Sequence, residues 1–250
     1  MPFQNQPAYL GTRVEAPEAR QIVRTTEQQV SFVRRVYAWM FAGVLATVMG
    51  IAIAVKSGLA EDLLFAGFGV QILLMVAWIG GAYGVQKVRN VPTWNVVAFA
   101  LYGLMTGIVI SGIVYVAIFM AKANGQAAGT YVLQAGGLTL VTFGGLSAYA
   151  FFSKRDFSFL RGFLTVGTIA LLGALVIGFF VEATAFQMLI SVFGVMLFAG
   201  YTLYDTQKVL RTYPDGEHVA GAMTLFLDFV LLFVYILRII LLVAGGGSRD

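Results

Sequence analysis

The sequence predicts an all-α integral membrane protein with seven transmembrane helices, and three observations lead to this prediction. Hydrophobic residues make up 59% of the 250 residues and charged residues only 11%. The mean hydropathy is +0.85, whereas a soluble domain has about 25% charged residues. The apolar residues also fall into stretches of about 20, the length at which a helix crosses a bilayer.

The predicted spans follow one another through short connections. They are Val36–Val55, Leu63–Val85, Trp94–Met120, Tyr131–Phe152, Leu160–Val181, Ala183–Tyr204 and Ala220–Val243. Only Glu182 separates the fifth span from the sixth. As one helix, the stretch from Gly162 to Tyr204 would measure about 65 Å, roughly twice the hydrocarbon thickness. We therefore expect the chain to double back at Glu182-Ala183-Thr184.

The segment before the first span has a different composition. Met1–Arg24 holds three of the five prolines, scattered charges and no apolar core. It also lacks the small-residue cleavage site of a signal peptide. We expect an uncleaved, disordered polar tail over residues 1–24, followed by a single seven-helix domain over residues 25–250.

Lysine and arginine gather on one side of the predicted spans, which sets the orientation. With the N-terminus in the cytoplasm, twelve of these residues fall inside and three outside. The twelve are Arg13, Arg20, Arg24, Arg34, Arg35, Lys87, Arg89, Lys154, Arg155, Arg161, Lys208 and Arg211, and the three are Lys56, Lys122 and Arg249. The bias predicts a cytoplasmic N-terminus. Seven spans then place the C-terminus outside, unless the last span is re-entrant.

Two acidic residues stand where the membrane makes them costly. Asp205 closes the sixth span, and Asp228 lies inside the seventh. An acidic side chain in the hydrocarbon layer costs roughly 2.5–3.5 kcal/mol on insertion scales, so it calls for a partner or a function. Arg89, at the end of the second span, is predicted on the same side of the membrane. Asp205 taken alone could equally be a solvated residue at a helix end, but Asp228 is too deep for that explanation.

These charges predict a proton-sensitive pair. Two carboxylates close together in a low dielectric cannot both ionise cheaply, so they would tend to share one proton. Arg238 lies near the far interface, where we expect it to reach the headgroups, with a counter-charge in a pore as the alternative. Glycines at small-xxx-small spacing, such as Gly80 with Gly84 and Gly103 with Gly107, are typical of close helix packing.

Several segments together resemble the bacterial branch of the Bax inhibitor-1 family, the transmembrane BAX inhibitor motif proteins. They are Leu203-Tyr204-Asp205-Thr206-Gln207, the stretch from Leu227 to Phe233 followed by Leu237-Arg238, and Arg34-Arg35-Val36-Tyr37. The resemblance extends over nearly the whole chain from about Thr25. It implies a bacterial inner-membrane protein whose last helix is central, wrapped by the other six.

The resemblance also implies a function, a pH-sensitive calcium-permeable leak. In the family, two aspartates form the latch that senses pH, and an arginine at the end of the second helix pairs with one of them. Carried onto this sequence, the latch is Asp205 with Asp228 and the arginine is Arg89, with Lys87 as the alternative partner. Calcium would be the permeant ion, passing near the two aspartates, and we expect no cofactor. No acidic calcium-chelating cluster is visible.

Other functions were weighed against this one. An intramembrane aspartyl protease would need Gly-x-Gly-Asp where this chain has Leu225-Phe226-Leu227-Asp228, and a retinal protein would need a lysine in the last span. The single histidine, His218, is predicted in a loop, so no zinc site or histidine-based triad can be built. We expect no enzyme and, since the basic residues sit in short loops, no nucleic-acid partner. The alternative function is regulatory, with the tail docking on a membrane-anchored protease.

Overall fold

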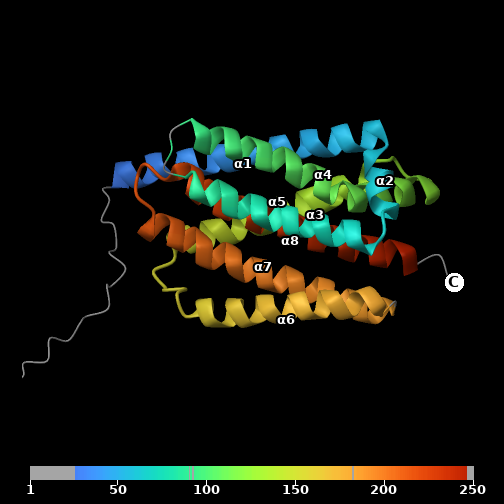
Figure 1. Cartoon of the computed structure of the whole chain (residues 1–250). Coiled ribbons are helices and arrows are strands. Elements are labelled where there is room, and N and C mark those ends of the chain that lie inside the picture. Colours follow the sequence, from blue (N-terminus) through green and yellow to red (C-terminus); the bar gives the residue numbers. More distant parts are fainter. Residues whose placement is uncertain (1–25, 90, 92, 182, 247–250) are drawn as a thin grey trace, which may run out of the picture.

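The structure is a computed structural model that describes residues 26–89, 91, 93–181 and 183–246. In this part of the chain the residues form eight helices (Figure 1). They are α1 (Thr26–Ser57), α2 (Leu59–Phe65), α3 (Phe68–Lys87), α4 (Trp94–Ala123), α5 (Thr130–Phe152), α6 (Leu160–Phe180), α7 (Thr184–Thr212) and α8 (His218–Gly246). All except α2 are long and apolar enough to cross a membrane. The prediction of seven transmembrane helices is confirmed, while the predicted tail lies outside the described residues.

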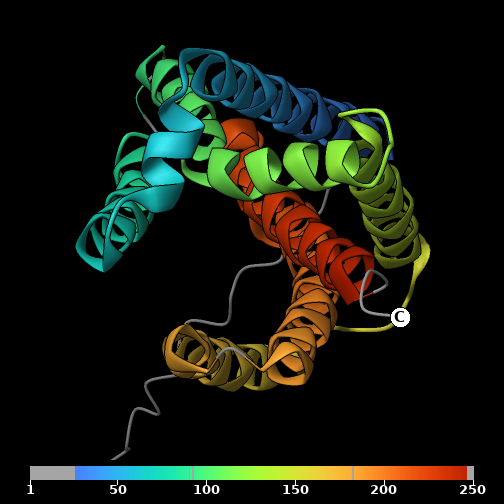
Figure 2. The same cartoon turned by 90° about the vertical axis from the view of Figure 1, so that its right-hand side faces the viewer.

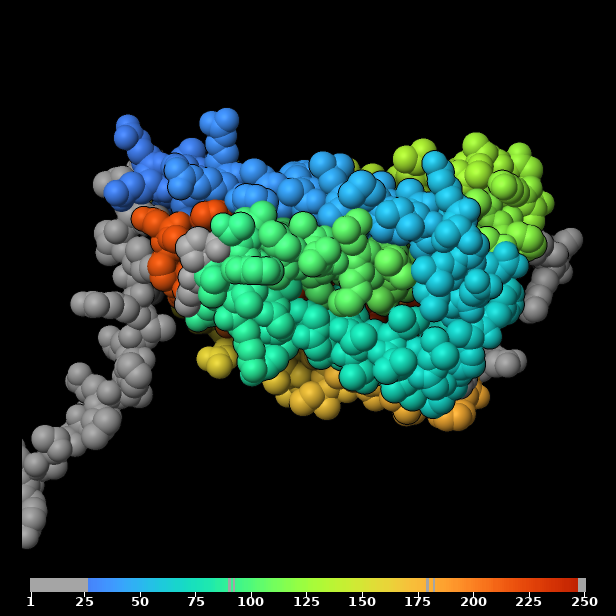
Figure 3. Space-filling model, turned by 45° about the horizontal axis from the view of Figure 1, so that its top comes forward, coloured from blue at the N-terminus to red at the C-terminus, as the bar shows by residue number. Residues whose placement is uncertain are grey.

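The long helices run back and forth between two ends of one bundle. The start of α1 and the loop between α7 and α8 lie at the same end, whereas α2 lies at the other (Figures 1 and 3). We call the first of these the basic end, because most of the described lysines and arginines belong to it. They are Arg34, Arg35, Lys87, Arg89, Lys154, Arg155, Arg161, Lys208 and Arg211. The opposite end carries Lys56 and Lys122.

Helix α8 is the centre of the bundle, as expected. It packs against α1, α4, α5 and α7, and Figure 2 shows it between α1 and α7. In the most apolar 18-residue stretch of α8, half of the residues are buried, whereas the buried share in the other spans is 6–33%. A helix that is apolar all round is typical of such a buried position. Helix α8 continues for 29 residues without a break, roughly 40 Å, which is long enough to cross the membrane fully and favours a crossing over a re-entrant segment.

Glycines bring α1 and α4 into close contact. A Cβ added at Gly107 would lie 2.1 Å from the carbonyl oxygen of Thr47. The Thr47 hydroxyl also donates a hydrogen bond across the contact to the Gly103 carbonyl, at 3.1 Å. Backbone approach of this kind drives helix association in lipid, where burial of apolar surface does not. Gly103 and Gly107 therefore act as predicted, but no described residue lies within 4 Å of a Cβ added at Gly80 or Gly84 of α3.

The second span begins later than predicted. The expected span Leu63–Val85 starts inside α2, which is a separate short helix, and the membrane-crossing helix α3 begins at Phe68. Gly58, with φ of 83°, precedes α2, and Gly67 precedes α3. Only glycine adopts such a positive φ without strain. Apolar residues continue across the break, so hydropathy alone does not reveal it.

The predicted reversal between the fifth and sixth spans is confirmed. Helix α6 ends at Phe180 and α7 begins at Thr184. The side-chain amide of Gln187, in the first turn of α7, donates to the carbonyls of Gly178 at 2.6 Å and Val181 at 2.9 Å. These carbonyls lie at the end of α6, where a helix leaves its last acceptors unpaired.

Helix α7 continues beyond the predicted end at Tyr204 and stops only at Thr212. Val209 and Leu210 in this extension are 2% and 8% exposed, so its inner face still belongs to the core. The expectation that Asp205 lies at a helix C-terminus was wrong, because the residue sits inside α7 about two turns before its end. Because residues 205–208 are polar, the hydropathy of the sequence does not predict that the helix continues through them.

Candidate functional site

The two predicted aspartates are both buried inside the bundle. Asp205 of α7 is 6% exposed and Asp228 of α8 is 4% exposed. They lie close enough for their charges to interact. Counted along the helices from the basic end, Asp205 is roughly 10 Å deep and Asp228 roughly 15 Å deep. The sequence prediction that these carboxylates share one region of the bundle agrees with this arrangement.

The aspartates differ in their partners. Lys208 Nζ lies 3.7 Å from Asp205 Oδ1, one helical turn away, and its side chain is 43% exposed. Asp228 Oδ2, by contrast, is buried and makes no hydrogen bond to any described residue. A buried polar oxygen without a partner costs about 1–3 kcal/mol. Such an orphaned carboxylate oxygen is a sign of function rather than of stability.

Hydroxyl groups from three helices surround the pair. The hydroxyls of Ser147 on α5 and Thr206 on α7 lie 3.4 Å apart. The Tyr37 hydroxyl of α1 lies within hydrogen-bonding reach of both, and close enough to Asp228 to interact with its charge. The polar cluster therefore joins α1, α5, α7 and α8. Tyr37 and Thr206 stand in the segments that carry the resemblance, but no role was predicted for their hydroxyls or for that of Ser147, because a single Ser, Thr or Tyr within a span carries no distinctive pattern.

The predicted arginine partner lies elsewhere in this structure. Arg89 Nε is 3.9 Å from Glu217 Oε1, and the arginine side chain is 45% exposed. The alternative partner, Lys87, lies over the ring of Tyr83 at 5.0 Å. Lys208 takes the place beside Asp205, since α7 extends far enough to bring a cation one turn further along the helix. The i, i+3 spacing of Asp205 and Lys208 was the signal in the sequence.

Arg238 lies on α8 towards the opposite end of the bundle. It is partly buried, and its guanidinium donates a hydrogen bond to the side-chain oxygen of Gln187 on α7. The predicted reach to the outer headgroups is therefore not what the structure shows. The guanidinium has its partner within the bundle, and Gln187 links it to the end of α6 through the bonds described above.

His218 is the first residue of α8 and not a loop residue as predicted. Its ring stacks on the indole of Trp39, with centroids 6.5 Å apart. Its Nδ1 is buried without a hydrogen-bond partner among the described residues. Within the described ranges, no three His, Cys, Asp or Glu side chains come together as metal ligands.

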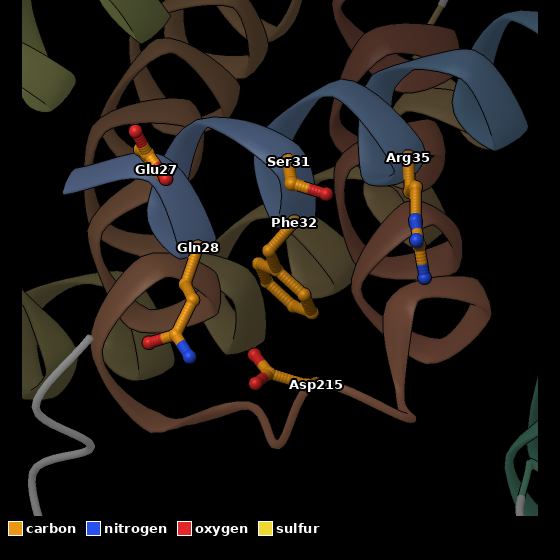
Figure 4. A pocket seen from close by; sticks show the side chains of 6 residues that line it. All are labelled: Glu27, Gln28, Ser31, Phe32, Arg35 and Asp215. Carbon is orange, nitrogen blue, oxygen red and sulfur yellow. The ribbon is translucent and has the colours of Figure 1, made fainter. Parts of the chain in front are cut away.

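A surface hollow at the basic end lies between the start of α1 and the α7–α8 loop. Gln28, Phe32 and Arg35 of α1 and Asp215 of the loop point into it (Figure 4). Neither buried aspartate lines this hollow. The aspartate pair, shut off from solvent within the bundle, is therefore the stronger candidate site.

Comparison with known proteins decides the family. The family described as "Inhibitor of apoptosis-promoting Bax1" matches residues 29–245, which is most of the chain. The chain belongs to the Bax inhibitor-1 family. The resemblance drawn from the aspartate segments is confirmed.

Relatives in this family come from bacteria and yeast. The chain is 30% identical to the inner membrane protein YbhL of Escherichia coli K12 over 241 residues, covering 89% of this chain and 96% of that protein. It is 42% identical to Bax inhibitor 1 of Schizosaccharomyces pombe over 110 residues, 44% of this chain and 41% of that protein. Together with the seven apolar helices, the likeness to YbhL supports a multi-pass inner membrane protein.

Proposed function

We propose that this Bax inhibitor-1 family protein is a pH-sensitive, calcium-permeable leak whose gate is the pair Asp205 and Asp228. The observation that carries the proposal is the burial of both carboxylates on neighbouring helices, with one Asp228 oxygen lacking a hydrogen-bond partner among the described residues. Burying charge in this way is expensive, so ionisable groups inside a membrane protein are functional candidates by default.

The gate would work through the proton that the pair holds. Two carboxylates in a low dielectric favour one shared proton over two charges. A change in protonation changes the attraction between α7 and α8, and it also changes the hydrogen bonding available to the nearby hydroxyls of Tyr37 and Thr206. Because the pair joins two helices, a shift in its protonation can favour one of two arrangements of α7 against α8.

Calcium suits this site chemically. Ca²⁺ binds oxygen ligands, carboxylates above all, in flexible geometry. When ionised and reached by water, Asp205 and Asp228 would supply two such ligands on the path of the ion. The bias of lysine and arginine places the basic end in the cytoplasm, and the aspartate pair lies nearer to this end of the bundle than to the other.

The test is calcium flux into dye-loaded proteoliposomes from about pH 5 to about pH 8. Wild type would be compared with Asp205→Asn, Asp228→Asn and the control Asp62→Asn, which removes an exposed carboxylate of α2. We expect pH-dependent flux in the wild type and the control, and loss of the pH dependence in the other two variants. Asp205→Asn flux that still titrates as in the wild type would refute the gate.

The same experiment addresses the alternative function. No flux above that of empty liposomes at any pH would refute the leak. It would favour a regulatory protein that modulates a membrane-anchored protease, and the aspartates would then be structural.

A further inference from the structure

A second hollow at the basic end is strongly basic. It lies between the start of α6 and the end of α7, two helices that pack side by side (Figures 1 and 2). Arg161 of α6 and Lys208 and Arg211 of α7 line it, together with a single carboxylate, that of Asp156. The hollow has a volume of about 240 Å³, several times the roughly 30 Å³ that a water molecule occupies.

The one carboxylate in the hollow is already engaged. Asp156 accepts hydrogen bonds from the backbone N–H and the hydroxyl of Ser158, at 2.9 and 3.0 Å. Arg211 approaches it at 3.8 Å, but both side chains stay open to solvent, with exposures of 35% for Arg211 and 63% for Asp156. An exposed pair of this kind is weak. The three cations outnumber the two carboxylates near them, Asp156 in the hollow and Asp205 beside Lys208, so the hollow is net positive and has exposed donors.

We propose that this hollow binds the phosphate group of an anionic lipid. Guanidinium groups bind phosphate through paired hydrogen bonds, and basic pockets between membrane helices at the cytoplasmic face are typical lipid headgroup sites. The place of the hollow favours a lipid over a free anion. It lies where α6 begins and α7 ends, and both helices are long and apolar enough to cross a membrane. Further along α6, Phe163, Val166 and Ile169 are exposed, and these side chains would lie against the acyl chains.

The hollow also connects to the aspartate pair through Lys208. This lysine lines the hollow, lies 5.7 Å from the ring centre of Tyr204, and is the cation 3.7 Å from Asp205. A phosphate in the hollow would compete with Asp205 for its ammonium group. Anionic lipid would therefore alter the gate, a consequence that rests on the proposed function, whereas binding itself does not.

Binding is tested on the full chain in detergent, by titrating phosphatidylglycerol and counting bound lipids by native mass spectrometry. The double variant Arg161→Gln/Arg211→Gln removes two cations of the hollow and leaves Lys208 in place. The matched control, Lys154→Gln/Arg155→Gln, removes two exposed cations beside the hollow that do not line it. Since each cation near an anionic lipid contributes about fivefold in affinity, we expect the hollow variant to bind roughly 30-fold more weakly than wild type. The control should lose clearly less affinity than the hollow variant, because its two cations do not line the hollow.

Three results would overturn the site. Equal loss of phosphatidylglycerol affinity in both double variants would mean a diffuse charge effect. Binding of phosphatidylcholine as tight as that of phosphatidylglycerol would mean that the protein does not recognise the charge of the lipid. Displacement of the lipid by inorganic phosphate at equal concentration would mean that the hollow takes the free anion.

The effect on the gate is measured separately, as calcium flux in liposomes with and without phosphatidylglycerol. We expect flux to depend on phosphatidylglycerol in the wild type and in the Lys154→Gln/Arg155→Gln control, and not in the hollow variant. Flux that ignores phosphatidylglycerol despite binding would overturn the coupling through Lys208. No flux in any liposome would refute the proposed leak and leave the binding result unaffected.

Discussion

Replacing Gly107 with alanine tests how closely α1 and α4 must pack. The added methyl would lie 2.1 Å from the carbonyl oxygen of Thr47 and 2.8 Å from the backbone nitrogen of Ile51. Ordinary contact begins at 3.4 Å, so the two helices would have to separate by 1.3 Å at this point. Both obstructing atoms belong to a helical backbone and cannot rotate away as a side chain could.

The cost follows from this separation. Forcing an extra methyl into a well-packed contact costs about 1–3 kcal/mol. The hydrogen bond from the Thr47 hydroxyl to the Gly103 carbonyl, 3.1 Å long, would be stretched beyond its range, at about 1 kcal/mol. Alanine is favoured over glycine within a helix by about 0.5–1 kcal/mol, which offsets part of the loss. We expect Gly107→Ala to lower the free energy of unfolding by about 1–3.5 kcal/mol.

The assay is reversible unfolding of the purified chain in detergent, with Gly80→Ala as the matched control. Gly80 also lies within a helix and in a small-xxx-small pair, but an added Cβ there would meet no atom of the described part of the chain within 4 Å. The control should therefore equal the wild type or gain up to about 1 kcal/mol. If Gly107→Ala were as stable as Gly80→Ala, the close contact of α1 and α4 would be refuted.

Three further predictions concern polar groups. Gln207→Leu should loosen the loop before α6, because the Gln207 side-chain oxygen accepts a hydrogen bond from the buried N–H of Phe157 at 2.8 Å. Hydrogen exchange at the Phe157 amide should accelerate by about tenfold, as expected for a lost bond worth roughly 1–1.5 kcal/mol. An unchanged exchange rate would contradict this prediction. Hydrogen bonds from Ser158, the backbone N–H first, lower the pKa of Asp156. The turn formed by Asp156 and Ser158 is therefore stabilised at a pH above the unfolded-state pKa of Asp156, and it loses that stability as the pH falls through the lower folded-state pKa. At a pH below about 4, the Ser158 amide should become less protected from hydrogen exchange. The variant Asp156→Asn should show no such change with pH. Asp228→Leu should raise the free energy of unfolding by about 1–3 kcal/mol while abolishing pH-dependent flux, and a destabilised variant would show that the carboxylate is structural.

The aspartates themselves were found from the sequence, because a carboxylate inside an apolar stretch stands out against the cost of placing it there. Their partners were not. Arg89 was chosen for its position at a predicted span end, yet it lies beside Glu217, and Lys208 holds the place beside Asp205. Pairing depends on where a helix ends and which way each side chain faces, and α7 continues past the apolar stretch that predicted its length.

The same division holds for the fold. Seven spans and the reversal before Thr184 follow from the sequence, since the bilayer thickness limits every apolar stretch. The tertiary structure alone decided that Gly107 packs against α1, whereas an added Cβ at Gly80 would meet none of the described residues, and that Tyr37, Ser147 and Thr206 gather near the aspartates. Hydropathy depends only on the order of residues along the chain, so the sequence alone is enough to predict the spans. The neighbours of one side chain are set by helix rotation, and in lipid that rotation is selected by the packing of all the helices together.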